Sequence, residues 1–205
     1  MLVDSVHLEF GKLTVLQSAF VTSERGKVTG VLGRNGTGKS CLFKCIMGGI
    51  KPQNIFVRFN DEQSTDYGHI GDRVKYLPQN LFMPPRMTLD EAFRLYDVEY
   101  DGLVSFDPKF HTFQKKQFRE LSGGEARVAE MFIIIKSPSD FCILDEPFSN
   151  IAPIHVEKMQ SLIREEKANK GSSYLTICTK RSFRFQTTCS CSVTVTHSPS
   201  DQEKT

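Results

Sequence analysis

Polar and apolar positions alternate over much of the first thirty residues, as they do in strands that bury one face. Residues 2–10 (LVDSVHLEF) and 12–22 (KLTVLQSAFVT) show this pattern, and residues 27–32 (KVTGVL) form a short apolar run. Turn-forming residues separate these segments, at Gly11 and in the sequence SERG. The pattern predicts an antiparallel β patch at the start of the chain.

The apolar spacing changes to three and four in the middle of the chain, which indicates helices. Apolar residues between Gly38 and about Gly48 recur at this spacing before the sequence GGIKP. Residues from about 88 to 134 are mainly helical in pattern, and we interpret them as an inserted helical lobe. Residues 154–169 predict an amphipathic helix. Its inner side is expected to carry Val156, Met159, Leu162 and Ile163.

Three further segments predict strands. Residues 54–60 (NIFVRFN) and 73–79 (RVKYLPQ) are strand-like, and residues 140–147 (DFCILDEP) form a continuous apolar run that ends in two carboxylates. A run of this kind is typical of a central parallel strand that is covered on both faces.

Composition narrows the classes of protein that fit. The 205 residues carry a formal net charge of +2 with 24% charged residues, which gives no support for nucleic-acid binding. The longest apolar runs, such as MFIII at 131–135, fall far short of the roughly 20 residues that cross a bilayer. The first ten residues do not resemble a signal peptide, and the six cysteines contain no C-x-x-C pair. We expect a cytoplasmic protein with reduced thiols.

The segment GRNGTGKS at residues 33–40 has the spacing of a phosphate-binding loop. Its glycines let backbone N–H groups curl around an anion, and the helix that begins here directs its positive end at the same anion. Lys39 would reach the β- and γ-phosphates, and the Ser40 hydroxyl would ligate Mg²⁺. A glycine-rich strand-to-helix turn is the alternative. The predicted nucleotide contacts are Gly33, Arg34, Asn35, Gly36, Thr37, Gly38, Lys39, Ser40 and Cys41.

Asp145 and Glu146 end the predicted central strand, at the edge where ligands bind in open α/β sheets. Asp145 would hold Mg²⁺, directly or through water. Glu146 would polarise the water that attacks the γ-phosphate. The alternative is that both acids merely cap the next segment.

The segment LSGGE at residues 121–125 contains a second candidate anion site. Ser122 and Glu125 have the spacing of a capping box, so a helix is expected to begin here, and Gly123 and Gly124 leave its first amides bare. A simple helix cap explains the serine and the glutamate but not the two glycines.

The order of these motifs resembles that of the ATP-binding-cassette (ABC) ATPases. That family has a phosphate loop, a glutamine at the lobe junction, an LSGG signature and an aspartate-glutamate strand end, and here these are GRNGTGKS, Gln79, LSGGE and ILDEP. The resemblance covers about residues 3–153 and implies a fold class. We expect an α/β P-loop NTPase (RecA-like) core with an N-terminal antiparallel β patch and a small helical lobe at 83–128, all within one nucleotide-binding domain spanning 1–205.

The resemblance also implies roles and partners. Two cassettes, here a homodimer, would sandwich two ATP molecules on Mg²⁺, and a separate transmembrane permease would be the third partner. Catalysis is assigned to Glu146, Gln79 and Lys39, and the metal to Ser40, Gln79 and Asp145. The signature residues Ser122, Gly123, Gly124 and Glu125 would contact the nucleotide of the partner copy.

Two apolar positions keep two interpretations each. Phe10 matches the aromatic residue that stacks on adenine in the family, but a strand phenylalanine is as readily a core residue. Leu81, Phe82 and Met83 would form an exposed contact patch for the permease or, alternatively, a loop tucked into the chain's own core.

Three departures from the family pattern bear on activity. Cys41 stands where the family usually has a hydroxyl residue, and Ala152 where it commonly has an aspartate that links the two sites. The histidine that follows the next strand in the family is missing, with Thr179 or a neighbour at its place. The chain is therefore expected to be an ATPase of an ABC transporter with impaired activity or, alternatively, a degenerate regulatory module that binds ATP with little or no turnover.

The last residues, 181–205, are rich in serine and threonine and keep no regular period, so they predict loop or disorder. A one-base shift of reading frame near Ser173 is a hypothesis that explains both this tail and the missing histidine. The shifted codons permit the string DHLY at 176–179, where the family has its histidine. The DNA sequence across codons 170–200 tests the hypothesis.

Overall fold

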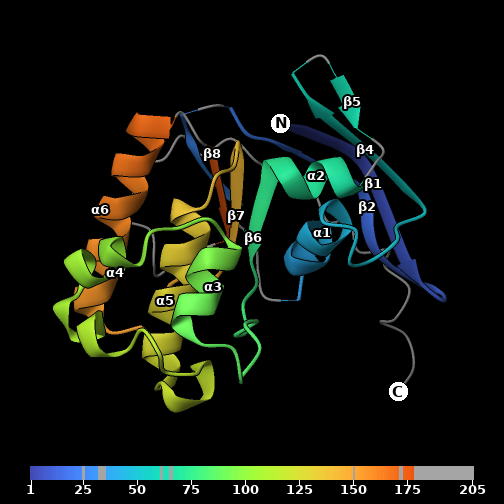
Figure 1. The fold of residues 1–205 in the computed structure, drawn as a ribbon. Helices are drawn as coiled ribbons and strands as arrows, with labels where there is room; N and C mark the ends of the chain where they lie inside the picture. Colours follow the sequence, from blue (N-terminus) through green and yellow to red (C-terminus); the bar gives the residue numbers. More distant parts are fainter. Residues whose placement is uncertain are drawn as a thin grey trace.

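The computed structural model describes residues 1–24, 26–31, 36–60, 62–64, 67–149, 151–170 and 173–177. Two β-sheets and the helices between and beside them make up this part of the chain. Figure 1 shows the antiparallel sheet on one side, the parallel sheet in the middle, and the longer helices on the other side. The predicted tail at 181–205 and the position of the missing histidine lie outside the described residues.

The antiparallel sheet has the strand order β2-β1-β4-β5. Strand β1 (Leu2–Phe10) pairs with β2 (Leu13–Thr22) through the turn at Gly11, where φ is +62°. Strand β4 (Asn54–Phe59) pairs with the other edge of β1, and β5 (Glu62–Ser64) follows it. The predicted antiparallel patch is therefore correct for residues 2–10 and 12–22, which β4 and β5 complete. It is wrong for the third segment, because Val28–Val31 pairs in the other, parallel sheet. All four of these residues are buried, as in a parallel strand covered on both faces.

The second sheet is parallel throughout, with the order β3-β8-β7-β6. Its strands are β3 (Val28–Val31), β6 (Val74–Leu77), β7 (Phe141–Asp145) and β8 (Ser173–Ile177). Because β6 and β7 are parallel neighbours, the residues that follow them emerge at the same edge of the sheet.

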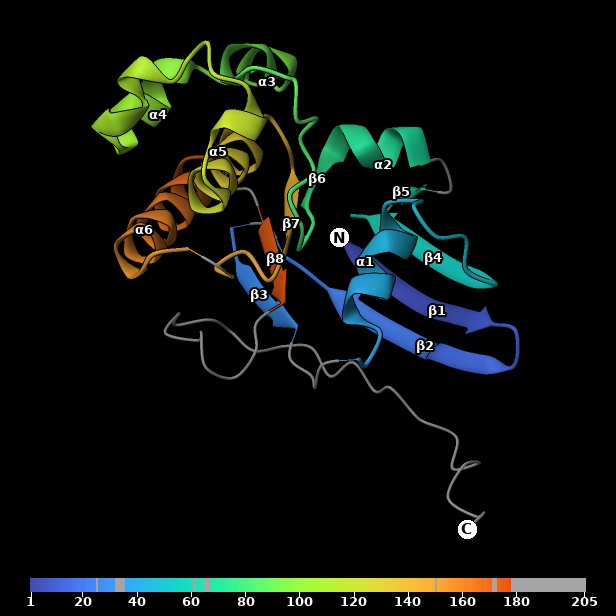
Figure 2. The ribbon, with the colours of Figure 1, turned by 90° about the horizontal axis from the view of Figure 1, so that it is seen from below.

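Helices cover both faces of the parallel sheet (Figure 2). Helix α1 (Lys39–Ile46) lies between the two sheets, whereas α5 (Gly123–Lys136) and α6 (Pro153–Lys170) lie on the opposite face. The remaining helices are α2 (Tyr67–Arg73), α3 (Leu89–Leu95), α4 (Tyr100–Phe106) and two 3₁₀ turns at Pro108–Thr112 and Phe118–Glu120.

Strand β7 separates two apolar clusters, and its side chains alternate between them. Phe141 and Ile143 belong to the cluster formed with α1 and the antiparallel sheet. Cys142 and Leu144 belong to the cluster formed with α3 to α6. This period-2 alternation with both faces buried explains why the segment reads as a continuous apolar run.

The predicted strands at 2–10, 12–22, 54–60, 73–79 and 140–147 are present, as is a strand within 27–32. Helices are also present between Gly38 and Gly48, within 88–134 and over 154–169, as predicted. Strand β5 and helix α2 were not predicted, because residues 60–73 are mostly polar and show no clear period. Of the predicted inner side of α6, Met159, Leu162 and Ile163 are buried, and Val156 is half-buried.

The segment 81–83 combines the two interpretations that its sequence allowed. Leu81 is 50% exposed, Phe82 packs against the apolar cluster of the helical region, and Met83 is buried. The prediction that all three side chains form an exposed patch is therefore wrong, because only Leu81 is exposed.

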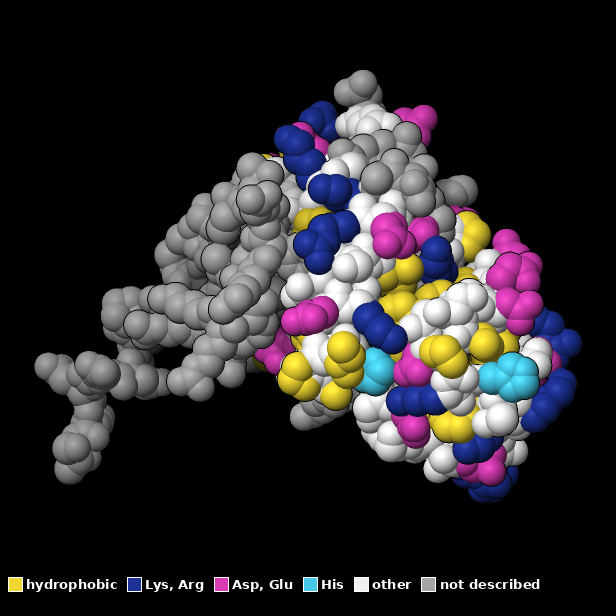
Figure 3. Space-filling view, turned by 90° about the vertical axis from the view of Figure 1, so that its left-hand side faces the viewer, with side chains coloured by type: hydrophobic (Ala, Val, Ile, Leu, Met, Phe, Trp, Pro, Cys, Tyr) yellow, Lys and Arg dark blue, Asp and Glu magenta, His cyan; other side chains and the backbone are white. Residues whose placement is uncertain are grey.

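The helical region comprises α3 to α6 and the two 3₁₀ turns, and its surface carries both charged and hydrophobic side chains. The face turned to the viewer in Figure 3 intersperses acidic and basic side chains with small groups of hydrophobic ones. No helix among the described residues combines the length and the apolar character needed to span a bilayer.

Helix α3 begins at a capping box that can be tested in isolation. The Thr88 hydroxyl accepts the Glu91 N–H at 3.2 Å, and the Glu91 carboxylate accepts the Thr88 N–H at 2.8 Å. We expect Thr88→Ala to lower the free energy of unfolding by about 1 kcal/mol, since the Glu91 N–H at the start of the helix loses the hydroxyl that accepts it. Urea unfolding measures this change. Ser105→Ala is the control, because the exposed Ser105 hydroxyl only donates back to Asp101 O within α4, and a loss as large as that of Thr88→Ala would contradict the capping explanation.

Candidate functional site

The phosphate-loop segment runs from β3 to the start of α1. Gly38 takes φ +81° as the N-cap residue, and α1 then begins at Lys39 with no side chain capping its first amides. These amides point out of the helix end beside Lys39 and Ser40, where the helix dipole is positive. Gly33, Arg34 and Asn35 lie outside the described residues, so their predicted contacts stay predictions.

A pocket of about 310 Å³ opens at this loop. It brings together residues from β2, the loop, α1 and the ends of β6 and β7. The described residues that line it are Val15, Gly36, Gly38, Lys39, Ser40, Cys41, Gln79 and Glu146. Three residues that were predicted for catalysis from distant parts of the sequence therefore share one pocket.

Gln79 and Glu146 meet because β6 and β7 are parallel neighbours. Leu77 is opposite Leu144 in the sheet, so the chain positions that follow each strand emerge side by side. The Gln79 amide donates to Glu146 Oε2 at 3.1 Å, and the Ser149 hydroxyl donates to the same oxygen at 3.3 Å. Both side chains therefore lie at the edge formed by the carboxyl ends of the strands, where the sequence predicts that the ligand binds.

Glu146 adopts a backbone conformation that is rare for a residue with a side chain. Its φ is +44°, in the left-handed region, where a residue other than glycine is disfavoured by roughly 1–2 kcal/mol. Strain of this kind persists only where surrounding contacts impose it. The conformation aims the carboxylate at Gln79 and into the pocket.

The donor set at the strand end fits a magnesium ion. Asp145 is 1% exposed, its Oδ2 accepts a hydrogen bond from the Tyr76 hydroxyl at 3.3 Å, and its Oδ1 has no hydrogen-bond partner among the described residues. Burial raises the pKa of Asp145, while a hydrogen bond with Ser40 opposes the increase. A buried carboxylate oxygen without a hydrogen-bond partner among the described residues, on a carboxyl group that interacts with the Ser40 hydroxyl, is the kind of hard ligand that Mg²⁺ takes from a protein.

The described residues contain no group of three or more His, Cys, Asp or Glu side chains that could form a metal cage of their own.

Phe10 lies at the end of β1 and is 51% exposed, so it is not a core residue. It is not among the described residues that line the pocket. Val15, which sequence reasoning did not select, lines the pocket instead from β2. No pattern in the sequence singles out Val15. The structure shows that it lies against the loop, because a Cβ on Gly38 would lie 3.1 Å from both the Val15 carbonyl oxygen and its Cγ1.

The signature segment forms the exposed tip of α5. The Ser122 hydroxyl accepts the Glu125 N–H at 3.3 Å, and Glu125 Oε2 accepts the Ser122 N–H at 2.9 Å, which confirms the predicted capping box. The backbone N–H of Ser122 is the main cause of the lowered pKa of Glu125. Neither this serine nor Gly123 or Gly124 lines the pocket of its own chain.

Sequence reasoning missed two charged residues in α5. Arg127 is 3% exposed and Glu130 is fully buried, although both lie in the apolar half of the helix. The signal that could have found them is the presence of an arginine and a glutamate, one turn apart, within the apolar stretch ARVAEMFIII.

Comparison with known proteins places the chain in a family. The family model described as ABC transporter matches residues 16–149, well over half of the 205 residues. The chain therefore belongs to the ABC transporter family, as an ATP-binding-cassette protein. Proteins of this cassette type bind ATP.

Individual relatives carry related names. The chain is 26% identical over 187 residues to a "Probable ABC transporter ATP-binding protein in ycf23-apcF intergenic region" of Cyanophora paradoxa, which covers 82% of this chain and 74% of that protein. It is 29% identical over 180 residues to the "Lipopolysaccharide export system ATP-binding protein LptB" of Acidithiobacillus ferridurans, covering 80% and 73% of the two chains.

Solved structures agree on the fold. One described as the ATP binding subunit of an ABC transporter superimposes with a TM-score of 0.73 at 21% identity, and the match covers 88% of this chain and 80% of that one. This similarity confirms the P-loop NTPase fold class.

Gly38 offers a test of the pocket's geometry. A Cβ at this position would lie 2.9 Å from Leu16 Cδ2 and would also meet the Val15 backbone, and φ is already in the left-handed region. We expect Gly38→Ala to weaken ATP binding by roughly tenfold or more, the effect of about 1.4 kcal/mol of strain. Titration with a fluorescent ATP analogue measures the affinity. Gly71→Ala is the matched control, since Gly71 lies in α2 away from the pocket and a Cβ there meets nothing within 4 Å, and equal affinities for the two variants would refute the steric argument.

Cys41 offers a probe of occupancy. It lines the pocket and is half-exposed, whereas Cys45 and Cys142 are buried. We expect ATP at about ten times its dissociation constant to slow alkylation of Cys41 by N-ethylmaleimide roughly tenfold, because only about a tenth of the pockets then remain open. Mass spectrometry of the Cys41 peptide measures the rate, and AMP at the same concentration is the control. An unchanged rate with ATP would show that nucleotide does not occupy this pocket.

Proposed function

We propose that the chain is the ATP-binding and ATP-hydrolysing subunit of an ABC transporter, working as a dimer on a separate membrane permease. The single observation that supports hydrolysis most directly is the hydrogen bond between Gln79 and Glu146 at 3.1 Å, beside Lys39 and Ser40 in one pocket. This arrangement supplies a cation, a metal ligand and a water-activating carboxylate at the same place.

Each group has a distinct task in the proposed reaction. Lys39 and the first amides of α1 hold the phosphates of ATP. Ser40 and Asp145 would hold Mg²⁺, which would supply positive charge against the phosphates. The Glu146 carboxylate orients the attacking water and takes up its proton, while the Gln79 side chain fixes the position of that carboxylate.

A second copy of the chain is proposed to complete the site. Ser122 and Gly123 are exposed at the tip of α5 and do not line the pocket of their own chain, although bare helix amides attract anions. The proposed arrangement is therefore head to tail, with the α5 tip of one copy on the γ-phosphate held by the other.

The proposed contact with the permease involves the exposed side chain of Leu81 and the exposed residues 84–86 of the loop that follows it. The names of relatives in transport systems support this proposal, and the relatives' cargo is not transferred to this chain.

The alternative is a regulatory module that binds ATP without efficient turnover. Ala152, which is exposed at the start of α6, supports this alternative, since the family resemblance implies an aspartate there that links the two sites. Both functions require ATP binding, so only turnover separates them.

A Glu146→Gln variant tests the proposal. The glutamine keeps the shape of the side chain but cannot accept a proton, so kcat should fall by roughly 10² to 10⁴ while ATP affinity is retained. Phosphate release measures turnover, and size-exclusion chromatography with Mg-ATP should show the variant trapped as a dimer. Glu165→Gln, an exposed change on α6, is the matched control.

Two results would contradict the proposal in different ways. Equal phosphate release from the unaltered chain and from Glu146→Gln would leave only the regulatory module. An absence of ATP binding by both chains would exclude both functions.

A further inference from the structure

Arg127 and Glu130 form a buried charge pair on α5, with Arg127 Nη1 3.8 Å from Glu130 Oε2. Removing two charges from water is costly, and a buried pair offsets this cost only where further hydrogen bonds use its remaining donors and acceptors. Backbone groups on both sides of Gln79 and at the end of β7 use them here.

The Arg127 guanidinium binds the backbone at the ends of both β6 and β7. It donates to Pro78 O at 2.6 Å, the residue directly before Gln79. It also donates to Asp145 O at 3.2 Å, Glu146 O at 3.5 Å and Pro147 O at 3.4 Å. One side chain therefore joins the two segments that carry the glutamine and the glutamate of the pocket.

Glu130 continues the connection away from the pocket. Its Oε1 accepts the N–H groups of Phe82 at 2.8 Å and Met83 at 2.9 Å. Glu130 thus holds the chain that follows Gln79 on one side, while Arg127 holds the chain that precedes it on the other.

The strained backbone of Glu146 needs such a restraint. Its φ of +44° describes rotation about the bond between its N and Cα, which the carbonyl groups of Asp145 and Glu146 flank. Arg127 Nη2 binds both of these carbonyl oxygens. Hydrogen bonds from a charged donor are stronger than those between neutral groups, so this pair can offset the cost of the left-handed backbone at Glu146.

We propose that Arg127 and Glu130 are positioning residues that set the distance between Gln79 and Glu146 and transmit the position of α5 to the catalytic carboxylate. This inference rests on the proposed function, because it names what moves the hydrolytic residues. Ser122 and Arg127 lie five positions apart on one rigid helix, so a phosphate that docks on the tip displaces the guanidinium with it. Arg127 and Glu130 then connect the tip of α5, where the phosphate would dock, to segment 78–83 and to Glu146.

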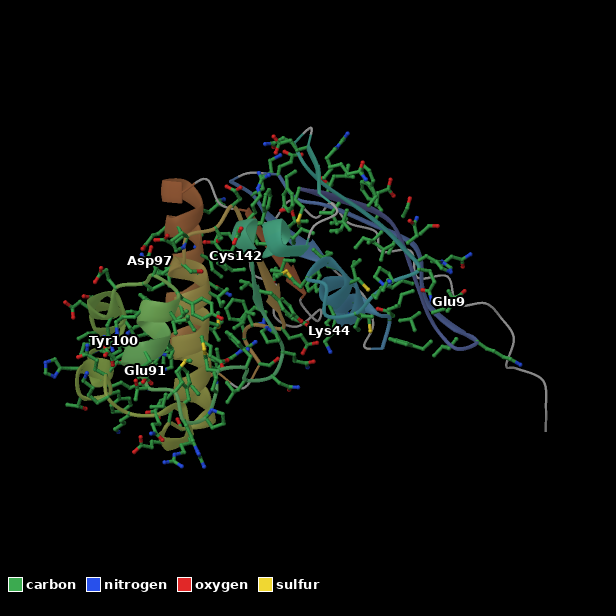
Figure 4. The ribbon with its side chains drawn as sticks, turned by 45° about the vertical axis from the view of Figure 1, so that its right-hand side comes forward. Glu9, Lys44, Glu91, Asp97, Tyr100 and Cys142 are labelled. Carbon is green, nitrogen blue, oxygen red and sulfur yellow. The ribbon has the colours of Figure 1, made fainter. Side chains whose placement is uncertain are left out.

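The pair lies in the layer between the helical region and the sheet. Figure 4 shows the helical region with Glu91 and Tyr100 on one side of this layer, and β7 with Cys142 on the other. The Tyr100 hydroxyl donates to Phe110 O at 2.7 Å, which anchors α4 independently of the pair. Loss of the pair should therefore loosen the strand ends without unfolding the helical region.

The test is the double variant Arg127→Met and Glu130→Met, measured in the full chain. The methionines fill a similar volume but leave the backbone groups that Arg127 and Glu130 bind without these partners, so the melting temperature should fall while the chain stays folded. Because a displacement near 1 Å can cost about 10²-fold in rate, kcat should fall roughly 10- to 100-fold while KM for ATP changes little. Arg127→Lys, which keeps the charge but lacks the planar fork, should restore only part of the rate.

Hydrogen exchange gives a readout that does not depend on turnover. In the double variant, amides of residues 78–83 and 144–149 should exchange faster, whereas those of α1 should match the unaltered chain. A purely structural role predicts instead faster exchange throughout the chain, α1 included, with no selective effect on residues 78–83 and 144–149.

The outcomes separate this inference from the proposed function. If the unaltered chain hydrolyses ATP and the double variant has the same kcat and the same exchange, the positioning role is wrong and the proposed function stands. If the unaltered chain shows no turnover, the hydrolytic function fails, and the exchange at 78–83 and 144–149 alone then decides the positioning role.

Discussion

The burial of β7 on both faces is the constraint on which the rest of the structure depends. Its side chains enter two separate apolar clusters in turn, so the strand cannot slide by one residue without exchanging those two faces. This fixes where Asp145 and Glu146 emerge. Parallel pairing with β6 then sets Gln79 beside them, and the pocket at the phosphate loop follows from this arrangement.

Three of the charged side chains at and behind the site, Arg127, Glu130 and Asp145, are buried. Burial raises the pKa values of both Asp145 and Glu130, and each is stabilised in its charged form by hydrogen bonds or by Arg127. Buried charge of this kind is costly, and the structure concentrates it along one line from segment 82–83 through α5 to the end of β7. The same line contains the strained backbone of Glu146, which locates the functional part of the molecule without reference to any ligand.

Most of the fold could be predicted from the sequence because its strongest patterns are local. The alternation in β1 and β2, the continuous apolar run of β7 and the capping box at Ser122 each depend on neighbouring residues. Strand β5 and helix α2 could not be predicted, because they are short, polar and set in place by neighbouring strands. The assigned roles of Phe10 and of the signature residues stay predictions, since they concern a bound nucleotide and a second chain.

The sequence by itself determined the chemical groups and their order: a lysine-bearing glycine loop, a serine-capped helix tip and a carboxylate pair at a buried strand end. Only the tertiary structure decided which of them meet, namely Lys39, Ser40, Gln79 and Glu146 in one pocket, with Val15 rather than Phe10 at its wall. It also revealed Arg127 and Glu130 as the link between the strand ends. The physical reason is that motifs arise from local spacing, whereas a contact across 67 residues, such as Gln79 with Glu146, depends on sheet order and helix packing.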